Sequence, residues 1–302
     1  MAPTQKILNT VLRFGQRLKF SITPNHFYSD IPDLAHLERE TYWRKPWSMT
    51  AIQGTDTKKQ LANLTSWCAP LSASLAKAQV HKRACDLNGE VGYGPTEADV
   101  LYCFLRANKP RKIVQVGCGV STAICLIAAE DEPGYKPEIV CVEPYPTPML
   151  TREHAAGRIR LFPQMAQTAP IEELTSLEAG DLFFVDSTHT VKPGSEVLRV
   201  IFEVLPRLKP GVFVHFHDIY FPYDYGPATL TTFYFWRETA MLMAFLTGNP
   251  SYEIAASLSM LHDSQQPGFR QAVPGYKPRP MRDGLSTGEG HFPSATYLRK
   301  IS

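Results

Sequence analysis

The chain has 302 residues, 44% of them hydrophobic and 20% charged, which is the balance of a globular protein with a full core. Its formal net charge of +2 argues against a nucleic-acid binder that works through charge. No apolar run reaches the length of a membrane-spanning helix and no signal peptide is recognisable, so we expect no integral membrane span and a cytoplasmic location. The six cysteines lack CxxC spacing, so we expect free thiols in a reducing compartment.

We expect residues 1–85 to form an N-terminal extension or cap and residues 86–302 to form the main domain. Near the start, apolar side chains such as Ile7 and Val11 are interspersed with basic ones such as Arg13, which predicts a weakly amphipathic helix. Such a helix could contact a membrane surface, or dock on its own domain or on a second subunit. A homo-oligomer is therefore one expected state.

Residues 88–108 are typical of a glycine-rich loop that leads into a helix. Pro95 and Glu97 indicate the helix start. A loop and helix just before the first strand can close over a ligand, so Tyr93 and Glu97 are candidate contacts.

Residues 111–146 read as a strand, a glycine turn, a helix, a second strand and an acid. Gly117 and Gly119 let the backbone approach a ligand, and the helix after them points free N–H groups at that ligand. Glu143 ends the second strand, where a carboxylate can accept both hydroxyls of a ribose. The pattern indicates half of a nucleotide-binding fold.

The glycine turn also restricts which nucleotide can bind. A dinucleotide fingerprint needs a third glycine, but Thr122 stands at that position, which argues against an NAD-dependent dehydrogenase. No phosphate-binding loop ending in Gly-Lys-Ser/Thr occurs. On this stretch alone, a plain tight turn in an α/β protein stays an alternative.

A third strand is expected at residues 159–162, followed by a helix-free polar stretch. Gln167 and Thr168 in that stretch either contact an adenine edge or lie in a surface loop.

The fourth and fifth strands end in a group of titratable side chains. One strand ends at Asp186, three residues before His189, and the next ends at His217 and Asp218, with a helix expected between them at residues 195–208. Because parallel strands end at the same edge of a sheet, we expect these four side chains to converge.

The last third predicts a helix at residues 229–248, a strand at 253–261 and a final strand at 294–300. Between the last two lies a segment rich in Pro and Gly, residues 263–293. Long irregular segments are often functional, so we expect a lid or a subunit contact there.

Several motifs are similar to those of one branch of the class I S-adenosylmethionine (SAM) methyltransferases. They are VDSTHTVKPGSEV, VHFHDIYFPYDY, NGEVGYGPTEADVLY and ITPNHFYSDIPD, and they spread over most of the chain. The resemblance implies a Rossmann-like α/β fold: a doubly wound, mostly parallel seven-stranded sheet with an antiparallel last strand. It implies SAM as the cofactor.

Carried over by position, the resemblance also assigns the cofactor contacts. Gly117, Gly119 and Ser121 would hold the methionine part, and Glu143 the ribose. Gln167 and Thr168 would hold the adenine, and Asp186 the amino end or a metal. The sequence departs from the pattern at Gln115, where an acid is usual, and at Thr188, where a second serine is usual.

Methyl transfer is an in-line displacement that needs an aligned nucleophile and, for a hydroxyl acceptor, loss of a proton. His189 and His217 are candidates for that proton transfer, with Asp218 beside them, because the ordinary pKa of histidine is about 6.5. A divalent metal held by Asp186, His217 and Asp218 is a second interpretation, and a purely structural network is a third.

The function expected from the sequence is therefore methyl transfer from SAM to a small molecule, at oxygen first and nitrogen next. A non-catalytic SAM-fold protein that binds or assembles with a partner is the alternative, motivated by Gln115 and the aromatic extensions.

Overall fold

The computed structural model describes residues 3–282, 285–286 and 288–302. Its centre is a seven-stranded sheet in the order β3-β2-β1-β4-β5-β9-β6. The strands β1 to β5 run parallel, and β9 runs antiparallel to both β5 and β6. The predicted Rossmann-like, mostly parallel sheet with an antiparallel last strand is confirmed. The strands of this sheet are β1 (Lys112–Val116), β2 (Glu138–Val142), β3 (Arg160–Phe162), β4 (Leu182–Val185), β5 (Phe213–Phe216), β6 (Tyr252–Ser257) and β9 (Thr296–Lys300).

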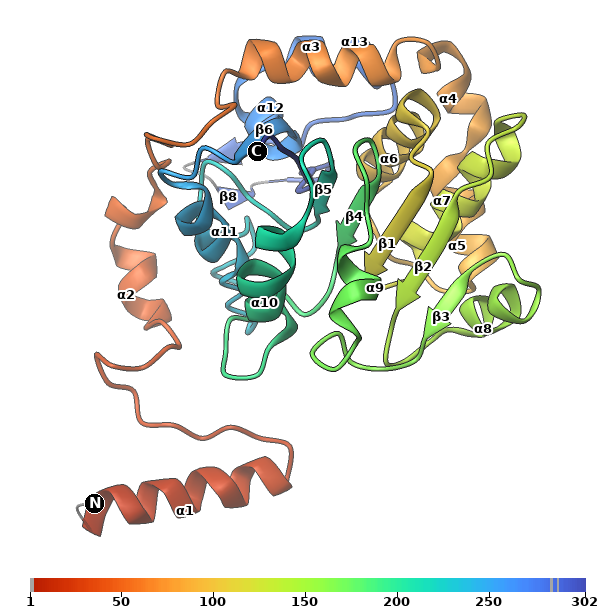
Figure 1. Ribbon diagram of the computed structural model, residues 1–302. Coiled ribbons are helices and arrows are strands. Elements are labelled where there is room, and N and C mark those ends of the chain that lie inside the picture. The colour runs from red at the N-terminus through yellow and green to blue at the C-terminus, as the bar shows by residue number, and fades with distance from the viewer. Residues whose placement is uncertain (1–2, 283–284, 287) are drawn as a thin grey trace.

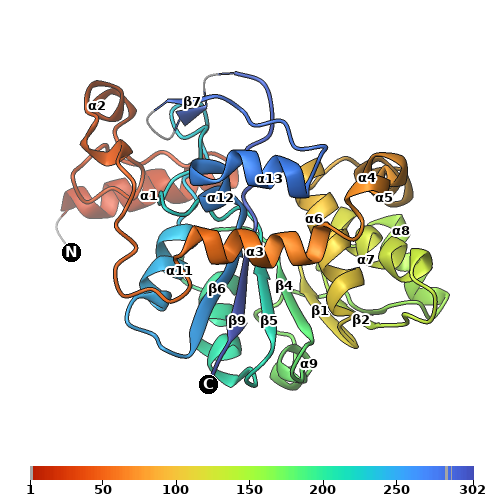
Figure 2. The same ribbon diagram turned by 90° about the horizontal axis from the view of Figure 1, so that it is seen from above.

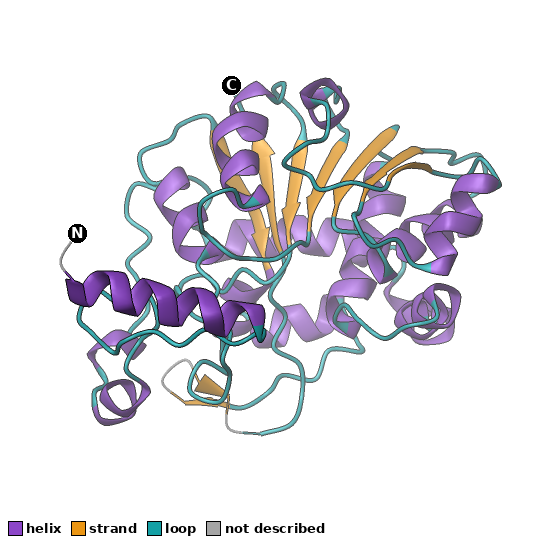
Figure 3. Cartoon of the chain, turned by 90° about the horizontal axis from the view of Figure 1, so that it is seen from below, coloured by secondary structure: helices purple, strands orange, loops and turns teal. Residues whose placement is uncertain are grey.

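Two helical layers cover the two faces of the sheet (Figure 2). One layer contains α3 (Thr57–Cys68), α4 (Ser72–Ala78), α5 (Val80–Asn88), α6 (Pro95–Asn108), α7 (Val120–Asp131), α8 (Pro148–Ala155), α12 (Leu258–Ser264) and α13 (Gln266–Ala272). The other contains α9 (Ile171–Thr175), α10 (Glu196–Arg199) with the turns Val200–Val204 and Leu205–Arg207, and α11 (Glu238–Leu246). Figure 3 shows the strands lying between these helices.

Alternation along β5 decides which side chains meet each layer. Val214 and Phe216 belong to the core under α10 and α11, whereas His215 stacks on Phe184 with a centroid distance of 4.4 Å on the other face. Successive strand residues point to opposite faces, so His217 lies on the same side as His215.

The N-terminal part includes α1 (Pro3–Arg17), α2 (Leu34–Arg39) and a short turn, Tyr42–Arg44 (Figure 1). The expected boundary at residue 85 falls inside α5, which packs on α7. Helix α3 also contributes the fully buried Leu64 to the core. Residues 57–85 thus pack into the main helical layer, and the domain boundary itself stays a prediction.

Three elements differ from their predicted extents. The helix expected at 229–248 begins only at Glu238, and the strand expected at 253–261 ends at Ser257, where α12 begins. The helix expected at 195–208 is broken after Arg199 into wider and tighter turns, since Pro206 lacks a backbone donor.

The segment 263–293 is not irregular throughout. Helix α13 packs beside α3, and Phe269 and Tyr276 are buried in the core, so this half is structural. A short hairpin follows, β7 (Met281–Arg282) with β8 (Leu285–Ser286). Residues 283–284 and 287 of the expected lid lie outside the described residues.

The six cysteines are free thiols, as expected. No helix within the described ranges combines the length and apolar character needed to cross a bilayer.

Candidate active site

The glycine turn after β1 requires glycine at its first position. Gly117 has a φ of +83°, and a Cβ built there would lie 1.8 Å from the carbonyl oxygen of Asp186. The end of β1 therefore passes directly against the end of β4, which a larger residue would prevent.

Glu143 ties the same turn to the end of β2. Its carboxylate accepts hydrogen bonds from the backbone N–H of Cys118 at 3.1 Å and of Tyr145 at 2.9 Å. The carboxylate thus lies at the rim of the turn, with its position fixed from both sides.

A cavity of about 230 Å³ opens at this turn, and we call it the cofactor cavity. Six of the predicted cofactor contacts line it: Tyr93, Gly117, Gly119, Ser121, Glu143 and Asp186. Asn88, Glu90 and Thr147 also line it, and sequence reasoning missed them. Asn88 ends α5, and Glu90 lies with Tyr93 in the loop that follows, so the loop expected to close over a ligand was the available signal. Thr147 donates a hydrogen bond from its hydroxyl to Asn88 Oδ1 at 3.1 Å.

The role of Gln167 and Thr168 as adenine contacts stays a prediction. Neither Gln167 nor Thr168 lines the cofactor cavity. The side-chain amide of Gln167 donates to the carbonyl of Gly194 at 3.0 Å and to Glu196 at 3.2 Å, and Thr168 donates to the carbonyl of Met165. Gln167 thus binds the segment between β4 and α10 and the first residue of α10, whereas Thr168 bonds within its own loop.

Gln115, which departs from the usual acid, is fully buried behind the turn. Its carbonyl oxygen accepts a hydrogen bond from the Thr122 hydroxyl at 2.8 Å, and its amide donates to Ser121 at 3.4 Å. Its polar groups are used inside the fold, between β1 and α7.

The ends of β4 and β5 bring together Asp186, His189, His217 and Asp218, the histidine–carboxylate cluster. His189 Nε2 lies 3.4 Å from Asp186 and 3.5 Å from Asp218, and His217 Nδ1 lies 3.5 Å and 3.6 Å from the same two carboxylates. His189 and Asp218 adopt φ values of +56° and +54°. Such strained backbone often occurs at functional sites, where the surrounding structure holds it in place.

Residues from distant elements fix the orientation of this cluster. Glu238 at the start of α11 pairs with His189 Nδ1 at 2.8 Å, and the Tyr93 ring stacks on His217 with centroids 4.5 Å apart. Ser294 and Tyr220 both donate to Asp218 Oδ1, at 2.9 Å and 3.1 Å. Sequence reasoning missed Glu238, Ser294 and Tyr220 as supports for the cluster.

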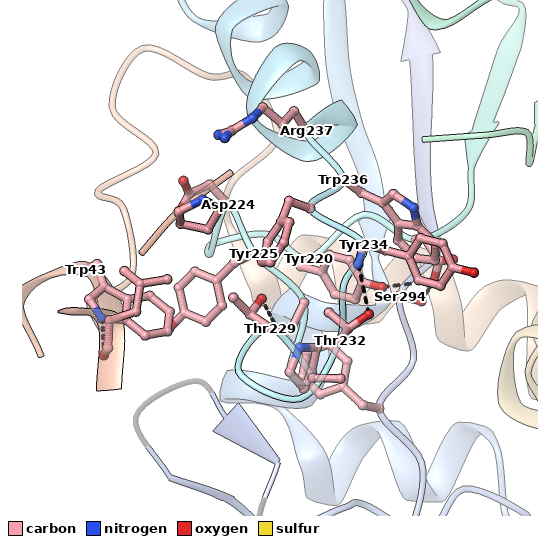
Figure 4. A pocket seen from close by; sticks show the side chains of 18 of the residues that line it. Trp43, Tyr220, Asp224, Tyr225, Thr229, Thr232, Tyr234, Trp236, Arg237 and Ser294 are labelled. Atoms are coloured by element: carbon pink, nitrogen blue, oxygen red, sulfur yellow. Dashed lines mark hydrogen bonds between the residues drawn. The ribbon is translucent and has the colours of Figure 1, made fainter. Parts of the chain in front are cut away.

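Asp218 of the cluster also lines a second cavity, of about 460 Å³ (Figure 4), and we call it the acceptor cavity. Asp218 and Ser294 are among its nineteen lining residues, and seven of the nineteen are aromatic. The aromatic lining consists of Trp43, Tyr220, Tyr225, Tyr234, Phe235, Trp236 and Phe292. Part of this wall comes from the N-terminal segment, through Pro32, Leu37 and Trp43.

With this geometry in place, residues 114–219 match the model of a family described as "Methyltransferase domain". This stretch of the chain therefore matches a methyltransferase domain. The matched range contains the glycine turn, Glu143 and all four residues of the histidine–carboxylate cluster. No curated protein matches the chain.

Solved methyltransferases resemble the chain in part. The methyltransferase PaMTH1 of Podospora anserina, bound to S-adenosylhomocysteine (SAH), is 17% identical. The match covers 78% of this chain and 95% of PaMTH1, with a TM-score of 0.45. An O-methyltransferase described as putative from Klebsiella pneumoniae is 14% identical, covering 78% and 98%, with a TM-score of 0.45. The O-methyltransferase TomG of Streptomyces achromogenes, in complex with SAM, is 12% identical, covering 78% and 96%, with a TM-score of 0.44.

The carboxylates around the two histidines of the cluster shift the pKa values of their rings. Burial lowers the pKa of His189, but its hydrogen bonds to Asp186 and Glu238 outweigh burial and raise the pKa to about 10. Burial likewise opposes protonation of His217, and the charges of Asp186 and Asp218 raise its pKa well above the ordinary value. Both shifts favour the protonated form of the rings, and the general-base role stays a prediction.

The carboxylates of the cluster respond in the opposite direction. Burial would raise the pKa of Asp218, but the charge of His217 lowers it to about 2. For Asp186 too, the nearby histidines outweigh burial and hold the pKa well below its usual range. The shifts of all four groups thus favour charged rings paired with charged carboxylates.

A divalent metal is the alternative occupant expected for Asp186, His217 and Asp218. Both ring nitrogens of His217 are buried without a hydrogen-bond partner in the described part of the chain, which would suit a ligand. Across residues 3–282, 285–286 and 288–302, however, no group of three or more His, Cys, Asp or Glu side chains is arranged to hold a metal ion. The metal site stays a prediction.

Proposed function

We propose that this methyltransferase transfers the methyl group of SAM to a hydroxyl oxygen of a small aromatic or apolar molecule. One observation carries the proposal: the two cavities adjoin at the histidine–carboxylate cluster. Asp186 lines the cofactor cavity, Asp218 lines the acceptor cavity, and His189 Nε2 lies within 3.5 Å of both carboxylates. A cofactor and an acceptor in these cavities would meet there.

The lining of the acceptor cavity supports the substrate class. Its volume of about 460 Å³ falls in the range of small-molecule sites. Aromatic walls favour flat apolar rings, while Ser294, Thr229 and Thr232 offer hydroxyls that can orient a polar group. The cavity therefore suits a phenol-like acceptor.

The carboxylate at the acceptor cavity supports oxygen as the acceptor atom. Asp218 is the cluster residue that lines this cavity, and its carboxylate can accept a hydrogen bond from the acceptor hydroxyl and polarise the O–H bond. The acceptor oxygen attacks the methyl carbon, an O–CH₃ bond forms, and the S–CH₃ bond breaks to leave SAH. The hydroxyl proton leaves to solvent through the acceptor cavity before transfer.

Tritiated SAM and a panel of phenols and aromatic amines test this function. We expect methyl ethers as products. Asp218→Asn should lower kcat by about 100-fold, because it removes a charged group at the point where the acceptor binds. Its SAH affinity should change less than about twofold, because Asp218 faces the other cavity. Asp86→Asn on the exposed surface of α5 is the matched control.

Other outcomes would contradict the proposal. Methylation of amines alone would move the acceptor atom to nitrogen. SAH binding with no transfer to any acceptor would favour the non-catalytic alternative.

A further inference from the structure

Helix α1 presents one continuous apolar face to water. Ile7, Phe14 and Leu18 are 64%, 63% and 57% exposed, and Val11 between them is exposed too. The spacing of these four residues places them on one side of a helix. An exposed apolar stripe of this kind usually marks a surface that binds a membrane or another protein.

The opposite side of the same segment is basic. Arg13 and Arg17 lie away from the apolar stripe at helical spacing, and Lys19 follows the helix. Residues 1–29 contain four of the 31 basic residues and none of the 29 acidic ones, the first acid being Asp30. The segment is therefore cationic as well as amphipathic.

The body of the protein does not cover this face. Figure 1 shows α1 set apart from the sheet and its helices, joined to α2 by an extended stretch. Phe20 and Ile22 in that stretch are also mostly exposed. In the structure, α1 therefore does not dock on the chain's own domain, which was one of the possibilities left by the sequence.

We propose that α1 is an interfacial helix that binds an anionic lipid surface, with its apolar stripe in the acyl boundary and Arg13 and Arg17 at the headgroups. Charge complementarity selects this occupant, because basic amphipathic helices without acids bind anionic bilayers through both forces together. A second copy of α1 would present the same positive charges and no acid to pair with them. The proposal is independent of the methyl acceptor.

Vesicle co-sedimentation of the full chain tests it. Wild type should bind vesicles of phosphatidylcholine with 30% phosphatidylserine at least about tenfold more tightly than pure phosphatidylcholine, and 0.5 M salt should weaken that binding. The pair Ile7→Ser with Phe14→Ser should reduce binding to the anionic vesicles at least about tenfold, and so should Arg13→Gln with Arg17→Gln.

Phe202→Ser with Arg207→Gln is the matched control, since Phe202 is exposed on a different helix. Every variant should keep wild-type SAH affinity, which separates this proposal from the cofactor site. Equal binding to both vesicle types would overturn it, as would wild type remaining in the supernatant. A wild-type dimer in sedimentation velocity that becomes a monomer in Phe14→Ser would also overturn it.

Discussion

At the scale of single residues, the site depends on positions whose backbone conformation restricts the residue type or the direction of the side chain. Gly117 is one, because β1 and β4 approach so closely there that the Asp186 carbonyl occupies the place of a side chain. His189 and Asp218 are others, since their left-handed backbone turns both side chains into one cluster. Such positions control geometry more than they control total stability.

Gly117→Ala should therefore abolish cofactor binding. The new Cβ would meet the Asp186 carbonyl at 1.8 Å, so the turn and the end of β4 must separate. We expect SAH affinity by calorimetry to fall at least about 100-fold, because the cavity wall itself moves. Gly180→Ala is the control: it has a similar φ of +88°, but nothing lies within 4 Å of its Cβ. An unchanged affinity in Gly117→Ala would show that the turn does not form the site.

Asp99 in α6 should make stability depend on pH. Burial raises its pKa from 3.8 to about 7. Between those pH values the folded state holds a proton that the unfolded state has lost. The contribution of Asp99 to the stability of the folded state is therefore fully present below about pH 4 and is lost as pH rises to about 7. Asp99→Asn should raise Tm by about 2–4 °C at pH 8 and by less at pH 5. An equal change at both pH values would contradict this origin.

At the scale of elements, the acceptor cavity is built by segments that are far apart in the sequence. The stretch between β5 and α11 supplies most of its aromatic wall, and the N-terminal segment and the residues before β9 close it. The Trp236 ring also packs on His189 with centroids 4.7 Å apart. This stretch therefore serves both the cavity and the cluster.

Trp236→Ala should raise the KM for the acceptor about tenfold or more, because it removes a large aromatic surface from the cavity wall. SAH affinity should stay within about twofold, since Trp236 does not line the cofactor cavity. Phe233→Ala, in the same stretch but 78% exposed and outside the lining, is the control for steady-state kinetics. Equal effects of both variants would indicate a general change in the loop.

Helix α3 offers a stability test of the domain boundary. Leu64 is fully buried against the helical layer, so Leu64→Ala should cost about 2–5 kcal/mol in urea unfolding. Thr65→Ala on the exposed side should change the free energy of unfolding by less than about 0.5 kcal/mol. A small change in the free energy of unfolding in Leu64→Ala would indicate that residues 57–85 form a separate extension.

The sequence predicted the central strands well, because short apolar runs between glycine and proline breakers are a local signal. It also predicted that Asp186, His189, His217 and Asp218 would converge, because parallel strands end at one edge. It overextended the helix before Glu238, since the aromatic residues of a cavity wall resemble a buried helical face. Partners such as Glu238 were not predictable, as they reach the site only through tertiary packing.

At the scale of the whole molecule, the sheet places the cofactor cavity over β1 and β2 and the acceptor cavity beyond β5. The histidine–carboxylate cluster separates them at the ends of β4 and β5. The N-terminal segment connects this site to α1, because residues after α1 line the acceptor cavity. The fold thus joins a cofactor site, an acceptor site and an exposed basic helix in one chain.

Calorimetric titration of SAH into the purified protein, with and without chelator treatment, tests the central claim most directly. We expect one site with a Kd of about 1–100 μM in both states, and a loss of at least about tenfold in Glu143→Ala, because Glu143 lies at the rim of the cofactor cavity. Release of a stoichiometric metal by the chelator would assign Asp186, His217 and Asp218 to a metal site. No heat of binding in either state would contradict the account.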